Sequence, residues 1–521
     1  MASLRFLISD VQMVWFFFTS ILASVTCDDN ARVHTSLGNM EGVVKLIRNE
    51  EVYQFRNIPY AEPPTGNLRL AKPVPVSSWS GVLNATEFGP ACMQPSYEDY
   101  IYDKYKPNTD ISEDCLSLNV YIPRNISVNA NRSVMVWIHG GSYLVGQGSS
   151  YDGSYLALTG DVVVVTLNYR LGPFGFLSSP ENGILGNYGL WDQRLALEWV
   201  QSNIAPFGGN PNSVTIFGQS AGGFCASIHA ILPQSRGLFR RVISQSGSPE
   251  GSLTLWKNAA SSSDLMILMS NCKNTNLTTL TCMRNAPARL IVDHSDYIFR
   301  YPMSNEGYFG LPSGPVIDKE LLVDDPAMLL INKALPNYNF FRSLDFMTGN
   351  VDTEGSITIN IIANYMQRYD NTSPFLMSSY VLCKYFMPKV MHMYFGNKNN
   401  SVTSEILCSL YRTSIPLDRA IAMKAYADAN FFAPAVKSLL KHSEDNHVTN
   451  SFQYLFRRPN IDPDIHTLYK RWTSGSTHGS DIPFLFGLED YQELYNISVT
   501  PADICLSKKM QKYWTNFAKT G

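Results

Sequence analysis

The sequence predicts an α/β fold built on a large, mostly parallel sheet with helices on both faces. Short, fully apolar runs recur along the chain, amphipathic helical patterns lie between them, and no internal repeat or Gly/Ser-rich linker divides the 521 residues. Apolar strands without polar alternation are typical of parallel sheets, which helices cover on both sides. An alternation of strand and helix indicates crossover connections and a doubly wound sheet.

The individual elements follow from these patterns. Strands are predicted in the runs VMVWI, VVVVTL, VTIF and RRVISQ, at 134–138, 162–167, 214–217 and around 242–243. A helix is predicted over 189–204, where Leu190, Leu195, Leu197, Trp199 and Val200 mark an apolar face. Segments rich in Asn, Ser and Pro, around 271–279, 396–404 and 458–466, are predicted as surface loops.

The composition excludes several classes of protein. Hydrophobic residues make up 45% of the chain, which excludes a mostly disordered protein and a membrane protein with many spans. The net charge is −3 and no basic stripe is present, so nucleic acid is not expected as a partner. No Cys/His cluster has the spacing of zinc ligands, and no metal site is predicted.

The first residues resemble a targeting segment. The stretch 11–27 is free of charge and strongly apolar at its start, but it is shorter than the ~20 residues that a spanning helix needs. Small residues at Ala23, Ser24 and Thr26 suit cleavage, so residues 1–27 are predicted as a signal peptide cleaved at about 24–27, and the mature protein is expected to be secreted. The long leading part with Asp10 leaves a signal anchor as the alternative.

Two further features agree with secretion. N-x-[ST] acceptors occur at Asn84, Asn125, Asn131, Asn276, Asn371, Asn399 and Asn496. Among the nine cysteines, the neighbouring pairs Cys92–Cys115 and Cys272–Cys282 are disulfide candidates in an oxidising compartment.

The strongest chemical motif is G-x-S-x-G at 218–222. A predicted strand precedes it and a helical pattern follows it, which is the context of a nucleophile elbow, so Ser220 is the candidate nucleophile. The alternative is an ordinary N-capping serine at a strand-to-helix turn. Acyl transfer also requires backbone donors for an oxyanion. Gly140 and Gly141, after the strand at 134–138, and Ala221, after the nucleophile, are the candidate donors, and His139 is expected to be structural.

At this point the sequence resembles the type-B carboxylesterase/cholinesterase family of α/β-hydrolases over nearly its whole length. The matching segments are FRNIPYAEPPTGNLRL (55–70), SEDCLSLNVY (112–121), WIHGGSY (137–143), NYRLGPFGFLS (168–178), the stretch 186–223 around the elbow, and YWTNFAKTG (513–521). The resemblance implies a single α/β-hydrolase domain over 28–521. Family members continue for several dozen residues beyond the position of Gly521, so a C-terminal segment is expected to be missing.

The resemblance also implies the rest of a catalytic triad. The acid falls at Glu354 in DTEGS, with Asp352 as the runner-up, and the base falls at His478 in the block THGSDIPFLFG. Without the resemblance, His478 and nearby His466 would be ordinary loop histidines. In these roles His478 takes the Ser220 proton and Glu354 orients the imidazole, and no metal or organic cofactor is required.

The cysteines and the substrate also follow from the resemblance. Both candidate disulfides match family bridges. The family usually has a third bridge, from a cysteine near Cys408 to one close to the C-terminus, and the resemblance implies that this partner is absent here because the chain stops at Gly521. Cys505 is an unsupported substitute, and Cys225 is expected to be a buried thiol. Tyr105 stands where cholinesterases have a Trp, and Gln219 stands where they have a Glu, so uncharged or lipophilic esters are expected. The alternatives are a cholinesterase and a non-catalytic adhesion member of the fold, although the latter usually lacks the nucleophile.

Overall fold

The computed structural model describes most of the chain. Described are residues 31–95, 108–257, 259–273, 275–300, 313–358, 376–395, 401–411, 417–459, 461, 475–495 and 497–521. The predicted signal peptide, Tyr105, His466 and the acceptors Asn371, Asn399 and Asn496 lie outside these residues.

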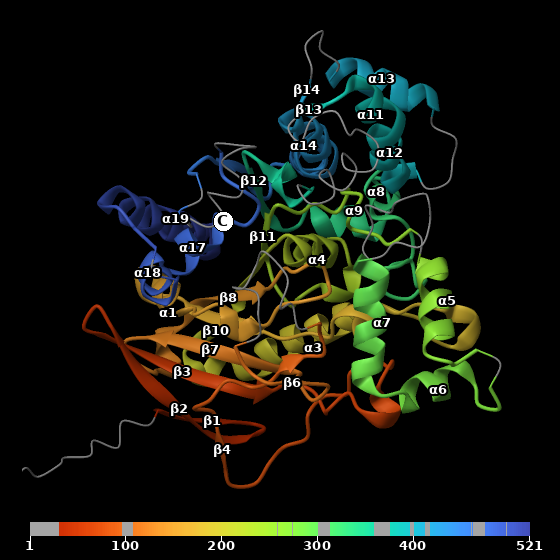
Figure 1. Cartoon of the computed structure of the whole chain (residues 1–521). Helices are drawn as coiled ribbons and strands as arrows, with labels where there is room; N and C mark the ends of the chain where they lie inside the picture. The colour runs from red at the N-terminus through yellow and green to blue at the C-terminus, as the bar shows by residue number, and fades with distance from the viewer. Residues whose placement is uncertain are drawn as a thin grey trace, which may run out of the picture.

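One large mixed sheet organises the molecule (Figure 1). Its strands run in the order β1-β2-β3-β7-β9-β8-β10-β11-β12-β15, and β4 pairs with β2 at one side. The bounds are β1 (Ala31–Thr35), β2 (Gly38–Ile47), β3 (Glu50–Pro59), β4 (Val82–Asn84), β7 (Ser117–Pro123), β8 (Arg132–Ile138), β9 (Val163–Leu167), β10 (Gly209–Gln219), β11 (Arg241–Gln245), β12 (Asp345–Val351) and β15 (Ser451–Phe456).

The sheet has an antiparallel and a parallel part. The pairings from β1 to β9 along this order are antiparallel, whereas β9, β8, β10, β11, β12 and β15 pair in parallel. The four predicted strands fall in β8, β9, β10 and β11, and all are confirmed. Because parallel strands end at the same edge, the segments that follow β8, β10, β11, β12 and β15 meet there.

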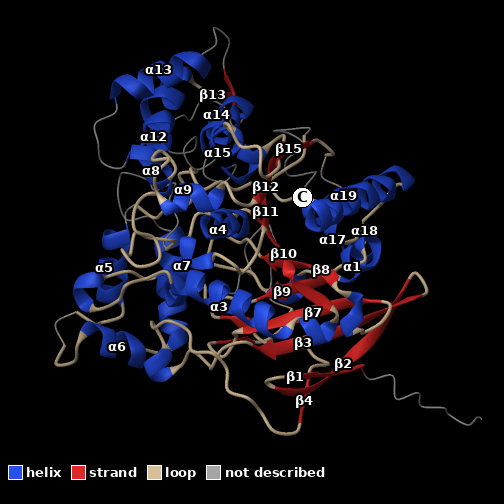
Figure 2. Cartoon of the chain, turned by 180° about the vertical axis from the view of Figure 1, so that it is seen from behind, coloured by secondary structure: helices blue, strands red, loops and turns tan. Residues whose placement is uncertain are grey.

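Helices cover both faces of the sheet (Figures 1 and 2). The predicted helix at 189–204 is confirmed as α3 (Tyr188–Asn203), with its expected apolar face buried. The other helices are α1 (Ser154–Gly160), α2 (Gly172–Phe176), α4 (Ala221–Ala230), α5 (Ala259–Met269), α6 (Thr279–Asn285), α7 (Ala288–Arg300), α8 (Pro326–Leu329), α9 (Pro336–Phe341), α11 (Ser379–Val381), α12 (Met387–Phe395), α13 (Ser401–Tyr411), α14 (Arg419–Ala427), α15 (Ala433–Ser443), α17 (Ile482–Phe486), α18 (Leu488–Tyr495) and α19 (Pro501–Thr520).

Two of the three hydrophobic clusters among the described residues lie on opposite faces of the sheet. In β8 the side chains of Val134, Val136 and Ile138 belong to one core, while those of Met135 and Trp137 belong to the other. This alternation follows from the two-residue period of a strand. Helices α3 and α4 contact one face, and α19 contacts the other together with α1 and α17. No helix in the described part of the chain is long and apolar enough to cross a membrane.

Three disulfides are present among the described residues. The candidate pairs Cys92–Cys115 and Cys272–Cys282 are both bonded. The third bridge joins Cys408 on α13 to Cys383, with their Cα atoms 5.4 Å apart, so Cys505 is not the partner of Cys408. That separation lies in the usual range for a disulfide. Cys505 is exposed and free.

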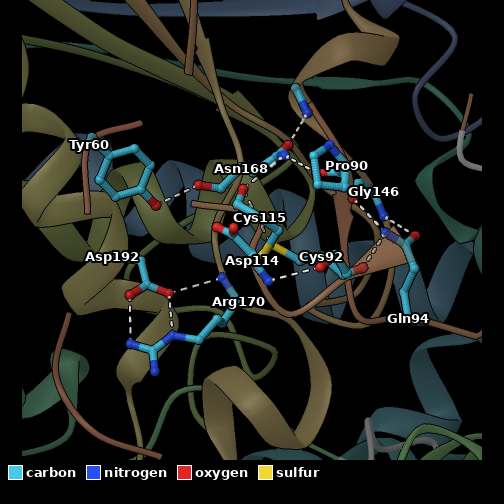
Figure 3. Close-up of a disulfide and its surroundings, with 12 residues drawn as sticks. Tyr60, Pro90, Cys92, Gln94, Asp114, Cys115, Gly146, Asn168, Arg170 and Asp192 are labelled. Carbon is cyan, nitrogen blue, oxygen red and sulfur yellow. Dashed lines mark hydrogen bonds and ion pairs between the residues drawn. A yellow bond between two sulfur atoms is a disulfide. The ribbon is translucent and has the colours of Figure 1, made fainter. Parts of the chain in front are cut away.

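The Cys92–Cys115 bridge is packed against the segment that carries the glycine turn (Figure 3). Asn168 Nδ2 donates to the carbonyl oxygens of Pro90, at 3.0 Å, and of Cys115, at 3.2 Å. Gln94, two residues beyond Cys92, exchanges two hydrogen bonds of 3.0 Å with the backbone of Gly146. The disulfide loop is therefore fixed to the turn that follows β8.

The acceptor asparagines within the described residues lie on the surface. Asn84, Asn125, Asn131 and Asn276 are all exposed, as attachment of a glycan requires.

Candidate active site

Ser220 occupies a strained turn between β10 and α4. Its backbone has φ 55° and ψ −126°, a conformation that non-glycine residues rarely adopt. The turn is held because the Ser220 N–H donates to the Gln245 carbonyl at 2.9 Å, and its carbonyl accepts from Phe224 N at 2.8 Å. A Cβ added to Gly222 would lie only 1.9 Å from the carbonyl oxygen of Ile138, so glycine is required there.

The position of Ser220 suits a nucleophile. It precedes the first residue of α4, where the helix dipole favours developing negative charge. Cys225 lies inside the same helix, and burial raises the pKa of its thiol to about 12, so it stays protonated and unreactive. The expectation of a buried thiol is thus confirmed.

The glycine turn after β8 lies directly against the elbow. A Cβ added to Gly140 would be 3.2 Å from Ser220 Cβ and 2.6 Å from the Gln219 carbonyl oxygen. Gly141 has φ +106°, which favours glycine. Within the described residues, the N–H groups of Gly140, Gly141 and Ala221 have no hydrogen-bond acceptor. These three donors are therefore available to an anion beside Ser220.

His139 is a neutral structural residue beside this turn. Burial lowers the pKa of its imidazole to about 4. Its Nδ1 donates to the Gly140 carbonyl at 2.8 Å, and its ring stacks on Tyr169 with the centroids 4.5 Å apart. His139 thus fixes the turn without carrying charge.

Glu354 lies three residues after the end of β12, is completely buried and accepts hydrogen bonds from four donors. Its Oε1 accepts from Ser246 Oγ at 2.6 Å, from Val351 N at 2.9 Å and from Asn350 Nδ2 at 3.2 Å. Its Oε2 lies 2.5 Å from His478 Nδ1. These bonds hold the carboxylate in one orientation and compensate for its burial.

Asp352, the alternative candidate for the acid, binds Ser476. Its Oδ1 accepts from the backbone N of Ser476 at 2.6 Å and from the Ser476 hydroxyl at 2.8 Å. Glu354, and not Asp352, therefore reaches the imidazole of His478.

His478 approaches the sheet edge from the segment after β15. Its backbone N–H donates to Ser356 Oγ at 2.9 Å, which places it beside Glu354. Its Nε2 lies 3.1 Å from Gln219 Nε2. Among the described residues, no hydrogen bond joins the Ser220 hydroxyl to His478. Glu354 and His478 are thus brought into contact, with Gln219 at the nitrogen that faces the elbow.

Two polar residues of this site escaped the sequence analysis. Ser246 follows β11 and donates to Glu354. Asp481 is fully buried three residues after His478, accepts from Gln245 Nε2 at 2.9 Å and from the Tyr454 hydroxyl at 3.2 Å, and has its pKa raised by burial. The available signal for Ser246 was its place after a parallel strand, since polar residues at that edge are candidates for a site.

Comparison with known proteins agrees with this architecture. The protein-family model described as "Carboxylesterase family" matches residues 29–521 of the sequence. The chain is 32% identical to acetylcholinesterase of Bungarus fasciatus and 32% identical to cholinesterase of Mus musculus, in each case over 94% of this chain and 78% of the relative. It is 31% identical to neuroligin-2 of Mus musculus, over 94% of this chain and 60% of that protein. With a matched family model over nearly all of its length and relatives at this identity, the chain belongs to the carboxylesterase family.

Proposed function

We propose that this protein is a secreted serine carboxylesterase that hydrolyses uncharged or lipophilic carboxylic esters through an acyl-enzyme. The observation that carries the proposal is the 2.5 Å contact between Glu354 Oε2 and His478 Nδ1, next to a serine on a nucleophile elbow. A buried carboxylate bound to one imidazole nitrogen leaves the lone pair on the other nitrogen, which can act as a base near that serine.

The proposed reaction begins with the tautomer that Glu354 selects. Because Nδ1 of His478 donates to Glu354, the neutral ring has its lone pair at Nε2. Nε2 takes the Ser220 proton as Oγ attacks the ester carbonyl, and the carbonyl oxygen becomes an oxyanion. The imidazolium then gives its proton to the departing alkoxide, which leaves as an alcohol.

The backbone donors act on the oxyanion. Within the described part of the chain, the N–H groups of Gly140, Gly141 and Ala221 have no acceptor, and each such donor contributes about 3–4 kcal/mol to transition-state stabilisation. Water then attacks the acyl-enzyme with His478 again as the base, and releases the carboxylic acid and Ser220.

The preference for uncharged esters rests on the residues beside the nucleophile. Gln219 carries no charge, so it offers a cationic substrate no counter-ion next to Ser220. Two relatives are named as cholinesterases, which makes choline esters the direct competitor to this proposal. A rate for a choline ester above that for its uncharged isostere would favour the competitor.

Secretion is proposed from the charge-free leader at 11–27, the three disulfides and the exposed acceptor asparagines. Expression of the full chain in cells with a secretory pathway should yield protein in the medium. Its mass should fall on treatment with a glycosidase that removes N-linked glycans.

Hydrolysis of a short-chain aryl ester tests the function. The wild type should turn the ester over, and the Ser220→Ala variant should lose nearly all of that activity. Equal rates in the two proteins would overturn the proposal. Circular dichroism of both proteins shows whether the variant is folded.

A further inference from the structure

The side chain of Gln219 lies between the imidazole of His478 and the glycine turn after β8. Its Nε2 is 3.1 Å from His478 Nε2. Its Oε1 would lie 3.2 Å from a Cβ added to Gly140. The residue is 4% exposed, so the carboxamide meets little water. The reaction proposed above uses the groups on either side of this carboxamide but gives the carboxamide itself no role.

The contact between the two Nε2 atoms is favourable in only one protonation state of the ring. The Nδ1–H group of His478 donates a hydrogen bond to Glu354, so the neutral ring presents a lone pair at Nε2. The amide nitrogen of Gln219 has two N–H groups and no accepting lone pair, and it can donate to the ring. An imidazolium would oppose N–H to N–H, and the carboxamide would then have to turn its oxygen toward the ring or move away.

We infer that Gln219 is a positioning residue that donates to Nε2 of the neutral His478 ring and releases this nitrogen to Ser220 when an ester binds. The inference rests on the proposed esterase function. It explains why the Ser220 hydroxyl makes no hydrogen bond to His478 in the structure, since the acceptor is already occupied. It also makes residue 219 a determinant of the pH at which the base becomes active.

The other titratable groups around His478 come from separate elements. Glu354 binds Nδ1. Asp481, at the N-terminus of α17, interacts electrostatically with both His478 and Glu354, and the hydroxyl of Tyr454 on β15 donates to Asp481. The ring of Phe431, 5.2 Å away, carries no charge. A substitution at position 219 leaves all of these in place, so a difference between variants reports the group at that position.

Two substitutions remove the donor, one with an apolar group and the other with a carboxylate in its place. Gln219→Met keeps the length of the side chain and removes the donor, which makes protonation of the ring easier. The acid limb of the kcat/KM profile should then move to higher pH by roughly half a unit to one unit. Gln219→Glu places a carboxylate beside the ring and favours the imidazolium, so the limb should move by about 1–3 units. In both variants the activity should rise to a plateau at alkaline pH, because the deprotonated base is restored there.

A matched control removes a buried glutamine elsewhere. Gln193 donates to Cys225 Sγ and accepts from His229 in the core between α3 and α4, without contact to His478. Gln193→Met should therefore leave the acid limb in place even if it lowers stability. The inference is supported if the midpoint pH of the acid limb rises from the wild type to Gln219→Met and rises further in Gln219→Glu. Acid limbs that coincide in active variants would overturn it.

A second measurement separates this inference from the proposed function. The low-field proton resonance of the Glu354–His478 pair can be titrated in Ser220→Ala and in Ser220→Ala combined with Gln219→Glu, neither of which needs to turn over. If the wild type hydrolyses none of the esters, the esterase proposal fails while this titration still decides the role of Gln219. A higher midpoint in the double variant supports that role, and equal midpoints overturn it.

Discussion

Replacement of Glu354 by glutamine tests the orientation of the base. The two carboxylate oxygens accept hydrogen bonds from four donors. Three of these donors point to Oε1, and His478 Nδ1 points to Oε2. A glutamine has one oxygen, and the three donors fix it at the Oε1 position. Its NH₂ group then faces Nδ1, so the imidazole must place its proton on Nε2. In that tautomer Nε2 has no lone pair to accept the Ser220 proton.

The expected loss follows from this wrong tautomer. A buried triad carboxylate replaced by its amide typically lowers kcat by about 10⁴, which corresponds to about 5.4 kcal/mol of activation free energy. The assay is steady-state hydrolysis of an uncharged aryl ester by Glu354→Gln, with active sites counted by an organophosphonate and folding checked by circular dichroism. A folded variant that keeps more than a tenth of the wild-type kcat would refute the reasoning.

Asp352→Asn is the control for this experiment. Asp352 binds the backbone and hydroxyl of Ser476, and its loss should lower stability more than activity, with kcat within about fivefold of the wild type. A 10⁴-fold loss in Asp352→Asn together with an active Glu354→Gln would exchange the roles of the two acids.

Three further predictions concern other parts of the molecule. Gly140→Ala should lower kcat by about 10²–10³, because the added Cβ would lie 2.6 Å from a carbonyl oxygen beside the nucleophile and would displace an oxyanion donor, as ester hydrolysis will show. Joint replacement of Cys92 and Cys115 by alanine should lower the free energy of unfolding by about 3 kcal/mol, measured in urea. Arg458 lowers the pKa of Asp503 to about 2, so this pair stabilises the fold above pH ~4, and the difference in stability between wild type and Arg458→Met should shrink as pH falls through about 2.

Each of these predictions has a contrary result. A kcat unchanged by Gly140→Ala would show that Gly140 does not contribute to the oxyanion hole. Cys505→Ser is the control for the disulfide, because Cys505 is exposed and free, and a similar loss of stability in both would show that the bridge itself contributes little. A stability difference for Arg458→Met that is the same at pH 2 and pH 6 would exclude the ion pair as its cause.

The sequence predicts four of the six parallel strands, because these four are buried on both faces, and it misses β12 and β15. The continuous apolar runs in β8, β9, β10 and β11 have few alternatives as secondary structure. The antiparallel strands β1 and β2 were not predicted, because their mixed exposed and buried residues give a weaker signal and their pairing depends on distant neighbours.

The residues of the candidate site could likewise be predicted only in part. The elbow at Ser220 is a local motif, so the sequence alone locates it. Glu354 and His478 lie far apart in the chain, and only the resemblance to a family singled them out from other acids and histidines. The contact of Gln219 with His478 is tertiary, and the pairing of Cys408 with Cys383 depends on how two helices pack, so neither leaves a local signal.

The central claim, that Ser220 is acylated during turnover, is tested most directly by mass spectrometry of the acid-quenched enzyme. After mixing with an uncharged aryl ester, the peptide that contains Ser220 should gain the mass of the acyl group, and the same peptide from Ser220→Ala should not. Turnover of the ester without an acyl group on Ser220, or with the acyl group on another residue, would contradict the claim.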